Sequence, residues 1–214
     1  MALGERIPAW FLGIDAFFEL LSIIAIVLLI WFSYKSYKLI GEKKYFWFSA
    51  AFGIILLAFA SRMFMHLCLY FGWTDFIGKV LHMLSWSAFV YVVFFLLAYI
   101  ILFAIAMEIH DKKMMIAIFL LIALILYYSG NYLMIFQYIA IVLLFIIGWK
   151  YFEYYWKKRN KNTLLISTAF SFLCLSHIAF GLIAFTDYLY ALGHLFQLIA
   201  YLIFLYFIIR VWKK

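Results

Sequence analysis

Four of the five histidines in this chain of 214 residues stand in two matching segments. The first segment, HLCLYFGWTDFIGKVLH, runs from His66 to His82, and the second, HIAFGLIAFTDYLYALGH, runs from His177 to His194. Each begins with His, contains Thr-Asp, and ends with a His seven residues after the Asp. Paired imidazoles on facing membrane helices suit axial ligation of a b-type haem, and they also suit binding of Cu, Zn or Fe.

The Thr-Asp pairs fall where one helix is expected to end and the next to begin. Thr74-Asp75 and Thr186-Asp187 are interpreted as helix caps, which bind the first free backbone N–H groups, in preference to metal ligands in an outer loop. At 1.5 Å per residue, the His that follows each Asp lies about 10 Å into its helix. We expect the four histidines to form one layer near the outer face, with their side chains turned inward because lipid-facing His is unfavourable.

Other polar residues recur on the same helix faces as these histidines. Arg62 precedes His66 by four residues, and it needs an acidic partner or a haem propionate inside a membrane. Glu19 is the first candidate partner of Arg62, and Asp15 is the second. The predicted cofactor-binding residues are His66, His82, His177, His194 and Arg62. The predicted metal ligands are the same four histidines with Glu19 and Asp15, and Ser85 and Gln197 are expected to orient the imidazoles of His82 and His194 by hydrogen bonds.

The composition predicts an all-α membrane protein. Hydrophobic residues make up 71% of the chain and charged residues only 12%. Continuous apolar runs exceed the ~20 residues that a helix needs to cross a bilayer, whereas barrel strands would alternate. No basic segment precedes the first run, so it is interpreted as a retained helix. Seven transmembrane helices are predicted, at residues 10–33, 46–71, 77–107, 114–129, 132–150, 163–185 and 188–210.

The basic residues predict the orientation of these spans. Fourteen of the 17 Lys and Arg residues follow spans one, three, five and seven. By the positive-inside rule, the amino terminus is outside and the carboxyl terminus is cytoplasmic, as in a multi-pass protein of the cell membrane. This topology and contact with anionic lipid account for the net charge of +8, so nucleic acid is not a predicted partner. The lipid bilayer is the predicted partner, and a membrane or cytoplasmic protein partner remains open.

The His segments belong to a wider internal repeat. IAIVLL occurs at 24–29 and at 139–144, and SAAF at 49–52 is matched by STAF at 167–170. The single domain 1–214 is therefore divided into repeat one at about 10–107, a connecting helix at about 114–129, and repeat two at about 132–210. Helices one to three and five to seven would form duplicated halves, related by a pseudo-two-fold axis along the membrane normal.

This layout of three, one and three helices resembles the SWEET sugar transporters and, more loosely, the microbial rhodopsins. The resemblance implies an architecture, but the motifs that carry those functions are absent. The only proline is Pro8, so the Pro-Gln motif of the SWEET group is missing, and the seventh span has no lysine for a retinal Schiff base.

Three functions fit the sequence. The favoured prediction is a histidine-rich intramembrane site that binds haem b or a transition metal (Cu, Zn or Fe) for electron transfer or sensing. The alternatives are a small-solute transporter with a SWEET-like layout, and a structural or sensory module whose histidines form a hydrogen-bond network. The sequence has no Ser-His-Asp, HExxH, CxxC or phosphate-loop motif, so enzyme activity is uncertain, a hydrolase is disfavoured and a redox role is open.

Overall fold

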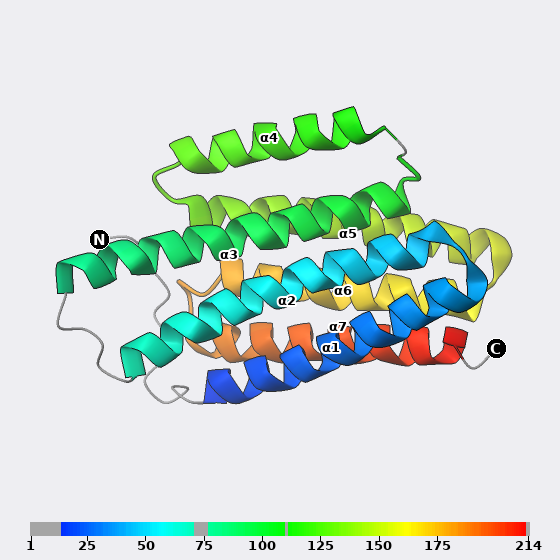
Figure 1. Cartoon of the computed structure of the whole chain (residues 1–214), viewed down its shortest axis with the longest axis horizontal. Helices are drawn as coiled ribbons and strands as arrows, with labels where there is room; N and C mark the ends of the chain where they lie inside the picture. Colours follow the sequence, from blue (N-terminus) through cyan, green and yellow to red (C-terminus); the bar gives the residue numbers. More distant parts are fainter. Residues whose placement is uncertain (1–13, 71–76, 110, 213–214) are drawn as a thin grey trace.

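The described part of the computed structural model of this chain consists of seven helices (Figure 1). The structure describes residues 14–70, 77–109 and 111–212, with the side chains of all of these except 15, 16, 64–70, 77–87 and 112. Within these residues the helices are α1 (Ile14–Ile40), α2 (Lys43–Tyr70), α3 (Ile77–Ala106), α4 (Lys112–Tyr128), α5 (Tyr132–Lys158), α6 (Lys161–Gly181) and α7 (Tyr188–Trp212).

Six of these helices are long and apolar enough to span a membrane, which confirms a multi-pass helical protein. The exception is α4, which has 17 residues and is therefore only about 25 Å long, against a hydrocarbon core of about 30 Å. The prediction of seven helices is confirmed, while the prediction of seven full-length spans holds for six. Most helix limits lie within a few residues of the predicted ones. However, α1 and α5 each continue seven or eight residues farther, into basic and aromatic sequence.

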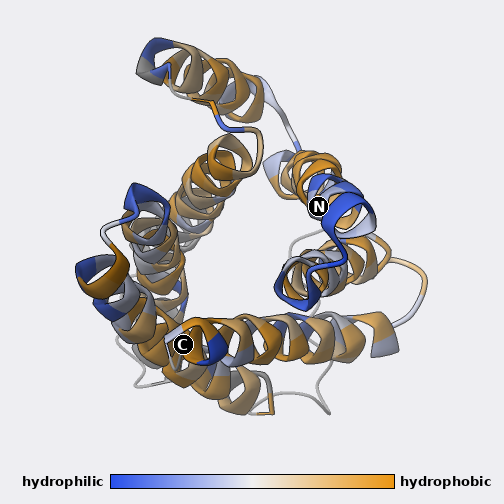
Figure 2. Cartoon of the chain, turned by 90° about the vertical axis from the view of Figure 1, so that its right-hand side faces the viewer, coloured by the Kyte–Doolittle hydropathy of each residue, from blue (hydrophilic) through white to orange (hydrophobic). Residues whose placement is uncertain are grey.

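The helices alternate in direction, so the turns gather at two ends of the bundle (Figure 1). One end holds the α1–α2, α3–α4 and α5–α6 turns and the end of α7, and we call it the basic end. Figure 2 looks at this end and shows hydrophilic residues at the near ends of the helices. Exposed basic residues at the basic end are Lys35, Lys38, Lys43, Lys44, Lys113, Lys157, Lys158, Arg159 and Lys161.

The six long helices close into a ring. Consecutive neighbours around it are α1, α2, α3, α5, α6 and α7, and α7 contacts α1 again. The short helix α4 lies outside this ring and packs against α3 and α5 (Figure 1). The ring thus places helices from the first part of the chain against helices from the last part at two seams, α1 with α7 and α3 with α5.

Aromatic side chains fill the interior of the ring. The rings of Phe52 and Tyr201 lie 6.3 Å apart and join α2 to α7, while Phe95 and Phe136 lie 6.2 Å apart and join α3 to α5. Offset and edge-to-face aromatic pairs of this kind add to the packing energy of a core. The largest fully buried side chains are Tyr99, Tyr201, Phe52, Phe59, Phe95, Phe136, Phe170, Phe204, Ile26, Leu29, Ile55 and Leu96.

The pair α1–α2 and the pair α5–α6 match in the spacing of their helix starts. α1 begins at Ile14 and α5 begins at Tyr132, 118 residues later, and both helices have 27 residues. α2 and α6 begin at Lys43 and Lys161, which are again 118 residues apart. The two helix pairs are therefore in register with each other through their turns at the basic end.

The turns of these two helix pairs also match. Gly41, with φ 78°, donates its backbone N–H to the carbonyl of Tyr37 (2.8 Å). Arg159, with φ 49°, donates in the same way to the carbonyl of Tyr155 (2.7 Å). A left-handed residue at this position ends a helix by satisfying its last carbonyls. Glycine adopts this conformation without cost, whereas the Arg159 guanidinium lies 4.7 Å from the Trp156 ring centroid, a contact that holds the residue in place.

A serine hydrogen bond recurs between the two helices of each pair. The Ser49 hydroxyl on α2 donates to the carbonyl of Ile30 on α1 (3.3 Å). The Ser167 hydroxyl on α6 donates to the carbonyl of Gly148 on α5 (2.8 Å). Both the donors and the acceptors are 118 residues apart. The two pairs therefore share a contact between their helices as well as the register of their helix starts.

Candidate functional site

A buried ion pair joins α1 to α2 in the half of the bundle that is distant from the basic end. The Arg62 Nε lies 3.0 Å from the Glu19 Oε1, and both side chains are at most 8% exposed. The predicted pairing of Arg62 with Glu19 is confirmed. A lone guanidinium inside a membrane bundle would be costly, so the carboxylate is the partner that lets Arg62 occupy this position.

Arg62 also contacts two tyrosines on other helices. A guanidinium NH₂ group of Arg62 donates to the Tyr190 hydroxyl on α7 (2.8 Å). The Tyr91 ring on α3 lies 5.4 Å from the guanidinium carbon, within cation–π range. Three different helices thus hold the guanidinium, through a carboxylate, a hydroxyl and an aromatic face. We call Glu19, Arg62 and Tyr190 the charged triad.

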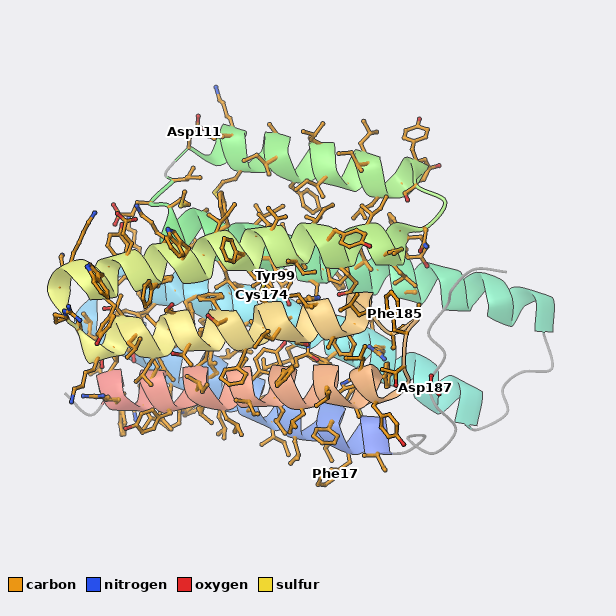
Figure 3. All side chains as sticks on the ribbon, turned by 180° about the vertical axis from the view of Figure 1, so that it is seen from behind. Phe17, Tyr99, Asp111, Cys174, Phe185 and Asp187 are labelled. Atoms are coloured by element: carbon orange, nitrogen blue, oxygen red, sulfur yellow. The ribbon has the colours of Figure 1, made fainter. Side chains whose placement is uncertain are left out.

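His177 on α6 is the centre of a second buried network. Its Nε2 lies 2.7 Å from the Tyr99 hydroxyl on α3, and its Nδ1 lies 2.6 Å from the Gln137 Oε1 on α5. The amide oxygen of Gln137 only accepts, so Nδ1 carries the proton and Tyr99 donates to Nε2. Both imidazole nitrogens of this neutral His are engaged. We call Gln137, His177 and Tyr99 the neutral triad. Figure 3 shows Tyr99 in the interior, near Cys174 of α6.

His194 lies between the two triads, surrounded by aromatic rings. Its ring centroid is 4.7 Å from that of Tyr190 and 5.1 Å from that of Phe180. Phe180 also lies 6.4 Å from His177, so one phenylalanine contacts both histidines. The neighbouring Gly193 makes room for this ring, because a Cβ built there would be 2.5 Å from Phe180 Cε1. His177 and His194, each 2% exposed, both face the interior as predicted.

Gln197 is buried one turn beyond His194, as predicted. Its amide donates to the Tyr201 hydroxyl on the same helix (3.3 Å). The role predicted for Gln197, orientation of the His194 imidazole, stays a prediction.

The turn that precedes α7 confirms the capping interpretation for the second Thr-Asp pair. The backbone N–H of Tyr188 donates to the Thr186 Oγ1 (3.4 Å), and the N–H of Leu189 donates to the Thr186 carbonyl (3.2 Å). Asp187 and Phe185 are exposed here at the end opposite the basic end (Figure 3). A hollow of about 390 Å³ lies against this turn and is lined by residues 183–188.

Several predicted site residues lie outside the described side chains. These are His66, His82, Ser85 and Asp15, together with Thr74 and Asp75 of the first turn. The helix lengths nevertheless constrain the level of His66. His66 is residue 24 of α2 and His177 is residue 17 of α6, so His66 lies about 10 Å farther from the basic end. Figure 1 shows the far ends of α2 and α3 extending beyond those of α6 and α7, so a single layer of four histidines does not follow from the helix lengths.

The described residues contain no group of three His, Cys, Asp or Glu side chains that could hold a metal ion. His177 would have to give up a hydrogen bond to Tyr99 or Gln137 before either nitrogen could bind a metal. The Cys174 thiol is directed to the Ile141 carbonyl (3.7 Å). His177 could therefore join a metal-ligand set only by giving up one of these hydrogen bonds, and the side chains of His66, His82 and Asp15 lie outside the described residues.

Sequence reasoning missed three members of these networks. Tyr99 and Tyr190 are two of 17 tyrosines, and nothing in the sequence distinguishes them from the interfacial ones. Gln137 had a usable signal, because it is one of two glutamines in the chain and interrupts an apolar span. A side-chain amide inside a membrane span needs a hydrogen-bond partner, as a buried histidine does.

The two triads together hold all six helices of the ring. The charged triad joins α1, α2 and α7, and the neutral triad joins α5, α6 and α3. Each triad joins two helices from one part of the chain to a third helix from the other part. Comparison with known protein families, curated proteins and solved structures found no match for this chain, so the chemistry of these networks is the guide to its function.

Proposed function

We propose that this chain crosses the cell membrane with its amino terminus outside and its carboxyl terminus in the cytoplasm. The basic end gathers the exposed lysines and arginines, and such residues are retained on the cytoplasmic side. Trp31 and Trp149 are exposed at equivalent positions of α1 and α5, and lysines follow each of them toward the basic end, as in an interfacial aromatic belt. Both triads then lie in the outer half of the bilayer.

The chain is proposed to consist of duplicated three-helix halves, α1–α3 and α5–α7, connected by α4. The 118-residue register of helix starts, turns and serine hydrogen bonds supports this proposal. The two IAIVLL segments are 115 residues apart, which is three residues fewer than this structural register. The sequence match was therefore displaced by nearly one helical turn, because Ile and Leu recur throughout both helices.

The function that the geometry supports best is that of a sensory membrane module, in which buried hydrogen bonds couple the two halves. One observation carries this proposal: Arg62 of the first half bonds to Tyr190 of the second, and His177 of the second bonds to Tyr99 of the first. Interhelical polar contacts fix the position of one helix against another inside a bilayer. A change at the outer triads would therefore reposition the halves, and straight helices would carry that change to the cytoplasmic ends.

A distance measurement across the bundle tests this coupling. Spin labels at Lys38 of α1 and Lys158 of α5, both exposed at the basic end, would be placed in a background without Cys68 and Cys174. We expect Tyr190→Phe, which removes one hydroxyl in the outer half, to shift or broaden the distance distribution.

Tyr206→Phe is the matched control for this measurement, because Tyr206 lies on the same helix but is 58% exposed. It should leave the distribution unchanged. Identical distributions for the wild type and Tyr190→Phe would contradict the proposed coupling.

Binding of haem or a transition metal is the second candidate function. The observation that favours it is His194, which is buried and faces the interior beside the charged triad. The ligand set would be His194 with His66 and His82, and Asp15 or Glu19 would supply a carboxylate. His177 is left out of this set because both of its nitrogens are engaged in the neutral triad.

Metal analysis and a visible absorption spectrum of the purified protein test this second candidate. A Soret band, or one equivalent of bound metal that is lost in His194→Ala, would support cofactor binding. Retention of the metal in His194→Ala but not in His177→Ala would contradict a ligand set that includes His194 and leaves out His177.

A further inference from the structure

The first helix of each half carries one member of a triad at the same position. Glu19 and Gln137 are 118 residues apart, so each is the sixth residue of its 27-residue helix. Each side chain turns to the next helix of its own half, where Glu19 meets Arg62 and Gln137 meets His177. In the same register Arg62 corresponds to Phe180, one turn beyond His177.

The third helix of the opposite half completes each triad. Arg62 donates to Tyr190 of α7, and its counterpart Phe180 also packs against Tyr190, with ring centroids 5.9 Å apart. Phe59, the counterpart of His177, lies 6.1 Å from the Tyr201 ring of α7. His177 itself lies 5.4 Å from the Tyr99 ring of α3. A histidine in place of Phe59 would therefore have a tyrosine of the opposite half beside it.

The neutral triad shows how this position can be satisfied without charge. An amide, an imidazole and a hydroxyl join three helices there, and both imidazole nitrogens are engaged. A buried ion pair carries a large desolvation penalty and is often replaceable by uncharged groups without loss of stability. The ring could thus have been built with two neutral triads, but the first half carries a carboxylate and a guanidinium.

From this comparison we infer that the Glu19–Arg62 charge is not required by the fold and serves as the functional, ion-bearing site of the outer half. This inference rests on the proposed duplication, and it assigns different roles to the two triads. The neutral triad is the scaffold that holds α3, α5 and α6 together. The charged triad is the place where an ionic ligand or a proton entering from outside would act on α1, α2 and α7.

Transplanting the neutral triad into the first half tests the inference. The variant Glu19→Gln/Phe59→His/Arg62→Phe gives the first half the residues of the second at all three positions. We expect it to purify as a monodisperse protein, with an unfolding midpoint about 2–4 °C above that of the control Glu19→Gln/Arg62→Phe, because the new imidazole gives the introduced amide a partner. A transplant that fails to fold, or that unfolds below its control, would overturn the inference, because the charge would then be structural.

The reverse transplant tests the equivalence of the positions independently. Gln137→Glu places a carboxylate beside the Nδ1–H of His177, and Phe180→Arg buries a guanidinium. We expect the double variant to unfold several degrees above the value that additivity predicts, because the two new charges would pair. Gln137→Glu with Leu175→Arg is the control, since Leu175 is 43% exposed, and this pair should be additive. Additive effects of Gln137→Glu and Phe180→Arg would overturn the equivalence of the positions in the two halves. The spin-label measurement tests the coupling through Tyr190 independently of this result.

Discussion

Replacing Arg62 with Leu should strongly destabilise the protein, because it leaves the Glu19 carboxylate buried without its cation. At the observed 3.0 Å and an effective dielectric constant of about 20, the lost attraction amounts to ~5 kcal/mol. Breaking a buried pair by removing one partner costs ~3–5 kcal/mol, since the remaining charge stays desolvated. The Tyr190 hydroxyl also loses the guanidinium N–H that donates to it, and this loss adds ~1–3 kcal/mol to the cost.

Replacing both partners should cost much less than the sum of the single changes. Arg62→Leu/Glu19→Leu leaves no unpaired charge, although the Tyr190 hydroxyl and the Tyr91 ring both lose the guanidinium as a partner. We therefore expect a coupling free energy of at least ~3 kcal/mol between the two sites.

Reversible unfolding in mixed micelles, followed by tryptophan fluorescence, would measure the four free energies of this cycle. The exposed pair Lys44–Glu42 is the control, with Nζ and Oε2 3.2 Å apart and both side chains more than half exposed. It should show little coupling, because solvent screens exposed ion pairs. If Arg62→Leu and Glu19→Leu were additive, the charged triad would not be an energetic unit and the reasoning from its geometry would be refuted.

Three further predictions follow from the same contacts. His177→Phe should lower the free energy of unfolding by ~2–4 kcal/mol, because it leaves Tyr99 and Gln137 without their shared partner, and Gln137→Leu should cost less in the same titration. Gly193→Ala should lower the free energy of unfolding by ~1–3 kcal/mol, because its Cβ would contact the Phe180 ring, and Phe180→Leu in the same chain should recover part of that loss. Equal losses with and without Phe180 would contradict the contact. A cysteine at Lys158 should be labelled only from the cytoplasm and one at Asp187 only from outside, and the reverse labelling would invert the proposed topology.

The helices could be predicted from the sequence because their limits depend on local features. Long apolar runs set the spans, and turn residues such as Gly41 and Thr186 set the ends. The pairing of Arg62 with Glu19 could also be predicted, because few charged residues occur within the spans and a buried guanidinium needs a carboxylate.

The rest of the site could not be predicted, because it depends on contacts between distant helices. His177 was expected to share a cofactor with His194, but its partners are Tyr99, 78 residues earlier, and Gln137, 40 residues earlier. Helical spacing shows which residues share a face, but it does not show which helix that face meets. The prediction of a cofactor stays open, because the side chains of His66 and His82 lie outside the described residues.

The central claim is that buried tyrosine hydroxyls join the two halves, and the association of separately expressed halves tests it most directly. The chain would be divided in the turn between α4 and α5, and residues 1–130 and 131–214 would be labelled with a fluorescent donor and acceptor and coexpressed. Tyr99→Phe with Tyr190→Phe removes only two hydroxyls, and at ~1–1.5 kcal/mol each we expect association to weaken by about 30-fold to 150-fold. The control pair Tyr127→Phe/Tyr206→Phe changes two exposed tyrosines and should have no effect. Equal association of the wild type and the Tyr99/Tyr190 variant would contradict the account.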